Sequence, residues 1–195
     1  IVRTLTALNY EESAPFLRAS VHVQMEPVWG GVQDAAIQLR GSAILALVQC
    51  TDLSRPEILR RLVDSLADPS DKVRIEALRA LEQMNGDEAA LLLRLKAHSG
   101  DSESSVVGQA FDSLLALERD RAVEFVAGFF NAASLEVRDE AALALGASRL
   151  PSAVRRLIEV CEGGGRPDFT PVLLRALSSS REESALSFLL NLVRE

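Results

Sequence analysis

Residues 73–81 read Val73-Arg74-Ile75-Glu76-Ala77-Leu78-Arg79-Ala80-Leu81, and residues 137–145 read Val137-Arg138-Asp139-Glu140-Ala141-Ala142-Leu143-Ala144-Leu145. Counted from each Val as position zero, both segments place apolar residues at positions zero, four and eight. The same skeleton begins at Leu39, Val106 and Phe169, so that successive starts are 34, 33, 31 and 32 residues apart. A nearly fixed period of this size is the signature of a stacked repeat architecture.

Each repeat is predicted to consist of two helices, a first helix A and a second helix B. In the clearest unit, Ser54 and Glu57 have the spacing of a capping box, and Pro56 lies in the first turn, where a backbone N–H is not needed. Apolar residues at helical spacing then predict helix A over 55–67 and, after a break, helix B over 71–84. The repeat units are predicted at approximately 10–50, 54–85, 87–118, 120–147 and 151–178, with a partial unit at 180–195.

These units predict a single all-α domain over residues 1–195, in the form of a right-handed α–α superhelix with about five helical pairs and a terminal helix. Gly163-Gly164-Gly165 is predicted to form a looser turn and is the nearest approach to a linker, but the repeat register continues across it. Residues 1–8 resemble the end of a helix, and the last helix, at 182–195, has an apolar face without a partner helix. We therefore expect the chain to be a fragment of a longer protein.

The first unit differs from the others because residues 23–31 form a longer connector. We predict a short helix at 14–22 before this connector and a long helix at 32–50 after it. Insertions in repeat proteins lie on one face, which is often the working face. Trp29 in the connector is therefore either a contact for a partner or a residue that packs over the end of the stack.

Residues 68–81 and 135–146 resemble the HEAT repeat, particularly the HEAT-like repeats of bacterial proteins, among them the phycobilin lyase subunits. The resemblance implies a HEAT-like solenoid in which a turn Asp and the Arg after the Val form a ladder of hydrogen bonds between repeats. By position, Asp68 and Arg74 keep both members of this pair, whereas Gly164 with Thr170 has neither. Asp101 and Arg138 keep one member each in neighbouring units and could meet each other. The residues assigned a structural role between repeats are Asp68, Arg74, Asp101 and Arg138.

The composition is that of an ordinary globular protein, with 48% hydrophobic and 25% charged residues. The formal net charge of -7 would repel a polyphosphate backbone at long range. No apolar run approaches the roughly 18 residues that cross a bilayer, so we predict a cytoplasmic protein without a membrane partner. Cys50 and Cys161 lie far apart in apolar helical stretches and are predicted to be buried free thiols.

No pattern in the sequence predicts catalysis, a cofactor or a metal site. A phosphate-binding Gly-Lys-Ser/Thr motif is absent. His22 and His98 are far apart, and neither has a second ligand at helical spacing. The serines lie at turns and caps without a positioned base, so a nucleophile is not indicated. We predict that the protein is not an enzyme.

Positions two, three and six of each B helix are predicted to form an exposed, concave ridge. These positions hold four acidic and two basic residues, whereas a groove for nucleic acid would need a run of Lys and Arg with stacking aromatic residues. The ridge positions are Gly41, Ser42, Leu45, Ile75, Glu76, Arg79, Gly108, Gln109, Asp112, Asp139, Glu140, Leu143, Pro171, Val172 and Arg175. The candidate partner-binding residues are Trp29, Ile75, Glu76, Arg79, Gln109, Asp112, Asp139, Glu140 and Arg175.

The leading functional hypothesis is a non-enzymatic scaffold that binds another protein or domain along this ridge. The resemblance to phycobilin lyase subunits implies an alternative, a protein that handles a chromophore. A third hypothesis, a HEAT-like protein that binds nucleic acid or repairs DNA, agrees poorly with the acidic ridge. The sequence predicts no cofactor, and it predicts neither nucleic acid nor membrane as a partner.

Overall fold

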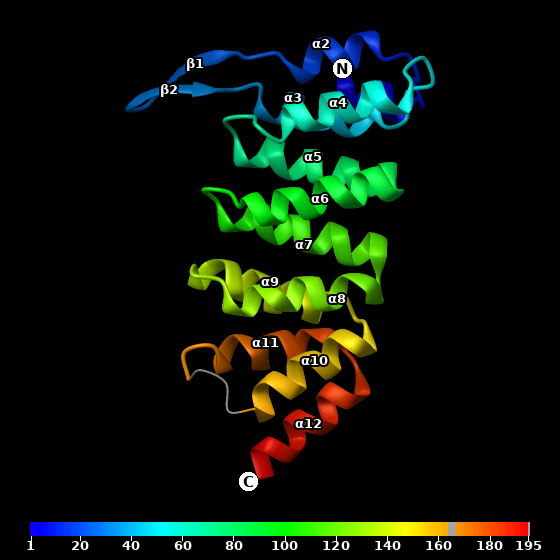
Figure 1. Ribbon diagram of the computed structural model, residues 1–195. Helices are drawn as coiled ribbons and strands as arrows, with labels where there is room; N and C mark the ends of the chain where they lie inside the picture. The colour runs from blue at the N-terminus through cyan, green and yellow to red at the C-terminus, as the bar shows by residue number, and fades with distance from the viewer. Residues whose placement is uncertain (164–166, 195) are drawn as a thin grey trace. The chain divides into compact units, whose positions relative to one another are not determined.

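The computed structural model describes residues 1–163 and 167–194, which form α-helices, one 3-10 helix and one β-hairpin (Figure 1). The chain divides into two compact units, Ile1–Leu92 and Leu93–Glu195, and the boundary falls within α6 (Asp87–Ser99). The all-α helical repeat fold is confirmed, while the right-handed superhelix and the single domain over 1–195 stay predictions. Of the turn predicted at 163–165, the last two residues lie outside the described residues.

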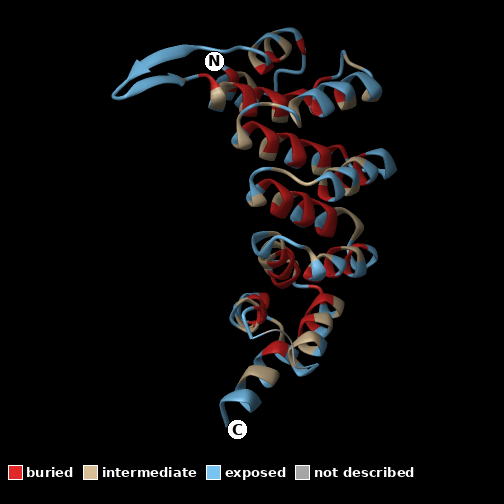
Figure 2. Ribbon diagram, turned by 60° about the vertical axis from the view of Figure 1, so that its left-hand side comes forward, coloured by how far each residue is buried: buried red, intermediate tan, exposed pale blue. Residues whose placement is uncertain are grey.

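The first unit is organised around α3, which packs against α1, α2, α4 and α5. Phe16, Ile44, Leu47 and Leu62 are fully buried in this unit and form part of its core. Figure 2 shows buried residues along α3 and α5 and exposed residues along the hairpin. The elements are α1 (Val2–Ala7), α2 (Ala14–Ser20), β1 (Met25–Val28), β2 (Gly31–Asp34), α3 (Ile37–Leu47), α4 (Arg55–Ser65) and α5 (Asp71–Met84).

In the second unit α9 has α7 and α11 as its main neighbours, so that three B helices form consecutive layers. Gly146 permits the close approach of α11, because an added Cβ atom would lie 2.3 Å from the carbonyl oxygen of Ala176. The elements are α7 (Ser104–Glu118), α8 (Asp120–Ala127), the 3-10 helix η1 (Gly128–Asn131), α9 (Leu135–Ala147), α10 (Pro151–Glu162), α11 (Thr170–Ser180) and α12 (Glu183–Arg194).

The predicted helix at 32–50 is wrong at its start, because β1 and β2 form an antiparallel hairpin and α3 begins only at Ile37. Val28 pairs with Gly31, which leaves Trp29 and Gly30 as a two-residue turn, and Gly30 supplies the positive φ of +90° that the turn needs. The Asp34 carboxylate accepts hydrogen bonds from the backbone N–H groups of Gln24 and Ala36. These two bonds stabilise the open end of the hairpin and the turn between β2 and α3.

Candidate functional site

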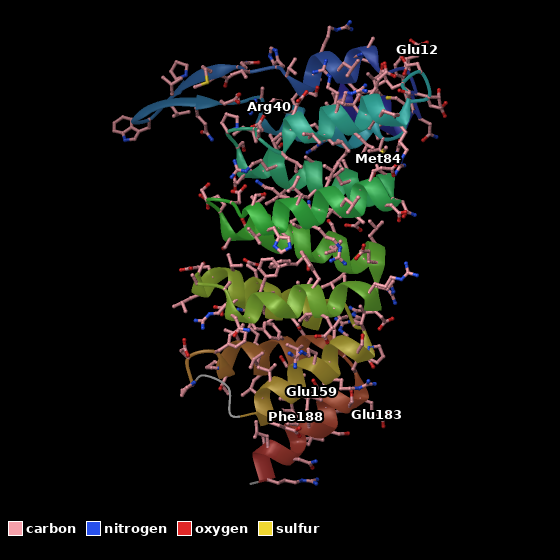
Figure 3. All side chains as sticks on the ribbon, in the orientation of Figure 1. Glu12, Arg40, Met84, Glu159, Glu183 and Phe188 are labelled. Atoms are coloured by element: carbon pink, nitrogen blue, oxygen red, sulfur yellow. The ribbon has the colours of Figure 1, made fainter. Side chains whose placement is uncertain are left out.

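Arg40 is the buried residue that fixes the hairpin to the helices, and Figure 3 labels it where the hairpin joins α3. Its Nη1 atom donates to Asp34 Oδ2 at 2.5 Å and to the carbonyl oxygen of His22 at 3.0 Å. Its Nε and Nη2 atoms donate to the two carboxylate oxygens of Asp68, at 2.9 and 3.2 Å. One guanidinium therefore joins both sides of the hairpin base to the turn before α5.

This cluster is a member of the ladder that the sequence analysis missed. Relative to Leu39, Arg40 and Asp34 occupy the same two positions as Arg74 and Asp68 in the next repeat. The register places Asp34 at the position of the turn Asp, but the predicted helix at 32–50 leaves no turn there. The hydrogen bond from Arg40 is the largest of the effects that lower the pKa of Asp34, from 3.8 to about 2.

The four residues assigned to the ladder lie at helix starts and turns. Arg74 is buried, and its Nη1 donates to the carbonyl oxygens of Asp68 and Pro69 at 2.8 and 3.1 Å. Arg138 donates to Asp168 at 3.2 Å, and the suggested contact between Arg138 and Asp101 stays a prediction. Asp168 directly precedes Phe169, whose ring lies 5.7 Å from the Arg138 guanidinium. The carboxylate of Asp101 pairs with Lys96 at 2.7 Å.

In the first unit the predicted ridge residues line a hollow of about 390 Å³. Gly41 does not belong to an exposed ridge, because it is buried under the side chain of Glu76, whose Cγ would lie 3.0 Å from an added Cβ. The hollow is lined both by predicted ridge residues and by other residues that were not predicted to belong to the ridge. The lining residues are Arg3 from α1, Ile37, Gln38, Gly41, Ser42 and Leu45 from α3, and Lys72, Ile75, Glu76 and Arg79 from α5.

A second hollow, of about 460 Å³, continues along α3 and shares Arg3, Ser42 and Leu45 with the first. It is completed by Thr6, Ala7, Ala46, Gln49 and Gln83. We call the two hollows together the α3 groove. Its floor is the surface of α3, and its walls are α1 and α5.

The α3 groove is basic although the chain as a whole is acidic. Arg3, Lys72 and Arg79 line it, and its one acidic residue, Glu76, forms an ion pair with Arg79 at 2.9 Å. In the part of the chain that the structure describes, Arg3 and Lys72 form no ion pair. The groove can therefore attract negative charge at its rim.

The ridge of the second unit has the opposite charge. Asp139 and Glu140 are half-buried on α9, and burial is the largest of the effects that raise the pKa of both carboxyl groups. Glu140 covers Gly108, which is buried and so is also absent from the exposed ridge. Gln109 donates to Ser113 at 3.1 Å. The two remaining candidates, Asp112 and Arg175, are exposed on α7 and α11.

Trp29 lies at the tip of the hairpin with a relative exposure of 105%, so the reading in which it packs over the end of the stack is wrong. Met25, Val28 and Val32 on the two strands are also exposed. The hairpin carries no Lys or Arg between Met25 and Asp34. It presents exposed apolar side chains, and its role in binding stays a prediction.

The described residues contain no group of three or more His, Cys, Asp or Glu side chains that could hold a metal ion. Burial raises the pKa of the Cys50 thiol to about 11, which keeps it protonated and unreactive at neutral pH. The ring of His98 packs edge-on against Phe125, with ring centroids 5.0 Å apart. Among the helices that the structure describes, none has both the length and the apolar composition needed to cross a bilayer.

Comparison with known proteins finds a HEAT-like repeat within the second unit. Residues 137–163 match the family model of the PBS lyase HEAT-like repeat, and this match covers most of α9, all of α10 and the turn between them. The resemblance to HEAT-like repeats is thus confirmed for this stretch. No curated protein matches the chain.

Proposed function

We propose that the protein is a non-enzymatic scaffold that binds another protein along the B-helix ridge. The α3 groove carries this proposal, because it gathers predicted ridge residues from two successive B helices into one hollowed surface. Its apolar side chains, Ile37, Leu45 and Ile75, lie beside charged ones, as in the mixed composition of protein interfaces. Trp29 on the hairpin is a second surface available to a protein partner.

The charges favour a protein over a nucleic acid as the partner. The three cations of the α3 groove are accompanied by no aromatic side chain on which a base could stack. In the second unit the corresponding positions are acidic at Asp112, Asp139 and Glu140. A continuous track for phosphates would need the same positive charge in both units.

The proposal is tested by placing a photo-crosslinking amino acid at single positions in the full chain within its native cells. Ridge positions Arg79, Asp112 and Arg175 are compared with Arg60 and Arg121, which are exposed on the A helices α4 and α8. We expect a discrete protein adduct from ridge positions and none from the two A-helix positions. Adducts that form equally from both sets, or from the A helices alone, would contradict the proposal.

The matched family model supports a second candidate function, because its printed name refers to a PBS lyase. In this alternative the protein handles a bilin chromophore. It is tested by mixing the full chain with a bilin and recording the absorbance spectrum. A scaffold leaves the spectrum unchanged, whereas a shifted and intensified band that follows the protein through gel filtration would favour the chromophore-handling function.

A further inference from the structure

The floor of the α3 groove has the length of a short helix. Its floor, α3, is 11 residues long, which corresponds to about 16 Å. A bound helix of roughly the same length has about three turns, and one face of such a helix presents apolar side chains at spacings of three and four residues. Ile37 and Leu45 are spaced along this floor, and Ile75 reaches it from α5.

The secondary structure of the groove favours a helical occupant over an extended one. An extended peptide gains much of its affinity by adding its backbone hydrogen bonds to an open sheet edge. Apart from Gln49, which follows α3, the lining residues of the groove belong to α1, α3 and α5, whose interior backbone N–H and C=O groups are already paired within the helices. A helix satisfies its own backbone and needs only side-chain contacts from the groove.

The cations at the rim of the groove favour an occupant with negative charge. Arg3 stands on the α1 wall, whereas Lys72 and Arg79 stand on the α5 wall, so cations flank the floor on both sides. Glu76 lies close to Arg79 and offsets part of its charge, but Arg3 and Lys72 have no carboxylate partner in the described part of the chain. Acidic side chains along both flanks of a bound helix would meet these two cations.

We propose that the α3 groove binds an acidic amphipathic helix of a partner protein. Apolar side chains of that helix lie on Ile37, Leu45 and Ile75, and its Asp and Glu side chains pair with Arg3 and Lys72. This inference rests on the proposed scaffold function and specifies the class of partner for the first unit. The acidic ridge of the second unit has no part in it.

The test is a selection of random peptides of about twelve residues, displayed on phage, against the full immobilised chain. Peptides that also bind the double variant Arg3→Glu, Lys72→Glu are removed in each round. Arg60→Glu serves as a matched control, since Arg60 is an exposed arginine on α4 outside the groove. Circular dichroism establishes that all variants have the helical content of the parent.

We expect the enriched peptides to combine Asp or Glu with apolar residues at helical spacing. The best of them, synthesised with a fluorescent label, should lose affinity by about threefold to tenfold for Lys72→Glu in anisotropy titrations, and by less than about twofold for Arg60→Glu. Higher salt should weaken its binding.

Several results would overturn the proposal: no enrichment, enriched peptides without an excess of acidic residues, or equal losses for Lys72→Glu and Arg60→Glu. Self-association of the chain that Lys72→Glu abolishes would also overturn it, because the occupant would then be a second copy. Crosslinks from ridge positions would still support the scaffold in any of these cases. The failure of the groove proposal is therefore distinguishable from failure of the proposed function.

Discussion

Within the first unit, Arg40 connects the irregular first repeat to the repeat that follows it. Its side chain is 4% exposed, and the carboxylates of Asp34 and Asp68 approach it from the hairpin and from the turn before α5. Because both acids are themselves mostly buried, the single positive charge of the guanidinium offsets the repulsion between two negative charges that would otherwise face each other in a poorly solvated space. The residue therefore controls both the stability of the first unit and the position of the hairpin.

Replacing Arg40 with Met should destabilise the protein by about 3 kcal/mol, because it leaves two carboxylates without their shared cation. The measurement is urea unfolding followed by circular dichroism. Arg60→Met is the matched control, since Arg60 is exposed and its loss should change the free energy of unfolding by less than about 0.5 kcal/mol. Equal effects of the two substitutions would show that the buried cluster contributes nothing specific.

Asp34 makes the stability of the protein sensitive to acid. The pKa of its carboxyl group is about 2 in the folded chain and 3.8 without these contacts. Ionisation of Asp34 therefore stabilises the folded chain. The stabilisation is fully present above pH 3.8 and is lost as the pH falls from 3.8 to about 2. Asp34→Asn should be less stable than the parent at pH 6, and the difference should shrink through this window. A difference that stays constant between pH 6 and pH 2 would contradict the assignment.

At the scale of elements, two glycines differ in what surrounds them. An added Cβ at Gly146 would lie 2.3 Å from the Ala176 carbonyl oxygen, a backbone atom that moves only if α11 moves. At Gly128 nothing lies within 4 Å of the same added atom. The spacing of α9 and α11 therefore depends on one missing methyl group.

We predict that Gly146→Ala destabilises the protein by about 1–3 kcal/mol, since the methyl group forces α11 away from α9. Gly128→Ala, its matched control, should leave stability unchanged or raise it by less than about 1 kcal/mol, because a less flexible unfolded chain favours folding. Thermal unfolding monitored by circular dichroism compares the two variants. Similar melting temperatures for both would refute the close approach of α11.

The helices were predictable where the residues that start and end a helix agree with the spacing of the apolar residues. Helix B of the clearest unit was expected over 71–84 and is found as Asp71–Met84, because the apolar positions of one face and the break at Asn85 both limit it. The capping box was also visible in the sequence, and the Glu57 carboxylate accepts the Ser54 backbone N–H at 2.8 Å. Such local rules need no knowledge of distant residues.

The hairpin was not predictable by the same rules. Its strands are four residues long and exposed along both faces, so they show no alternation of buried and exposed side chains. What fixes them is the Arg40 cluster, in which single hydrogen bonds join residues up to 28 positions apart in the sequence. The α3 groove shows the same division, since Ile75 and Arg79 followed from the repeat register whereas Arg3 belongs to no complete repeat.

At the scale of the whole molecule, the repeat architecture determines how far a local change is felt. In a stack of repeats each unit contacts its neighbours, so stability is close to a sum of local terms. The chain accordingly separates into two compact units, Ile1–Leu92 and Leu93–Glu195, each with its own buried core. The basic α3 groove lies in the first unit and the acidic ridge in the second.

This organisation predicts that the effects of the two destabilising substitutions are confined to different parts of the chain. Hydrogen exchange measured by mass spectrometry should show faster exchange in α3 and α5 for Arg40→Met and in α9 and α11 for Gly146→Ala. The other unit should keep most of its protection in each case, because Arg40 bonds within residues 22–68, and Gly146 packs against Ala176. If either substitution accelerated exchange equally in both units, the chain would unfold as one cooperative body. The additive description of the repeats would then have to be abandoned.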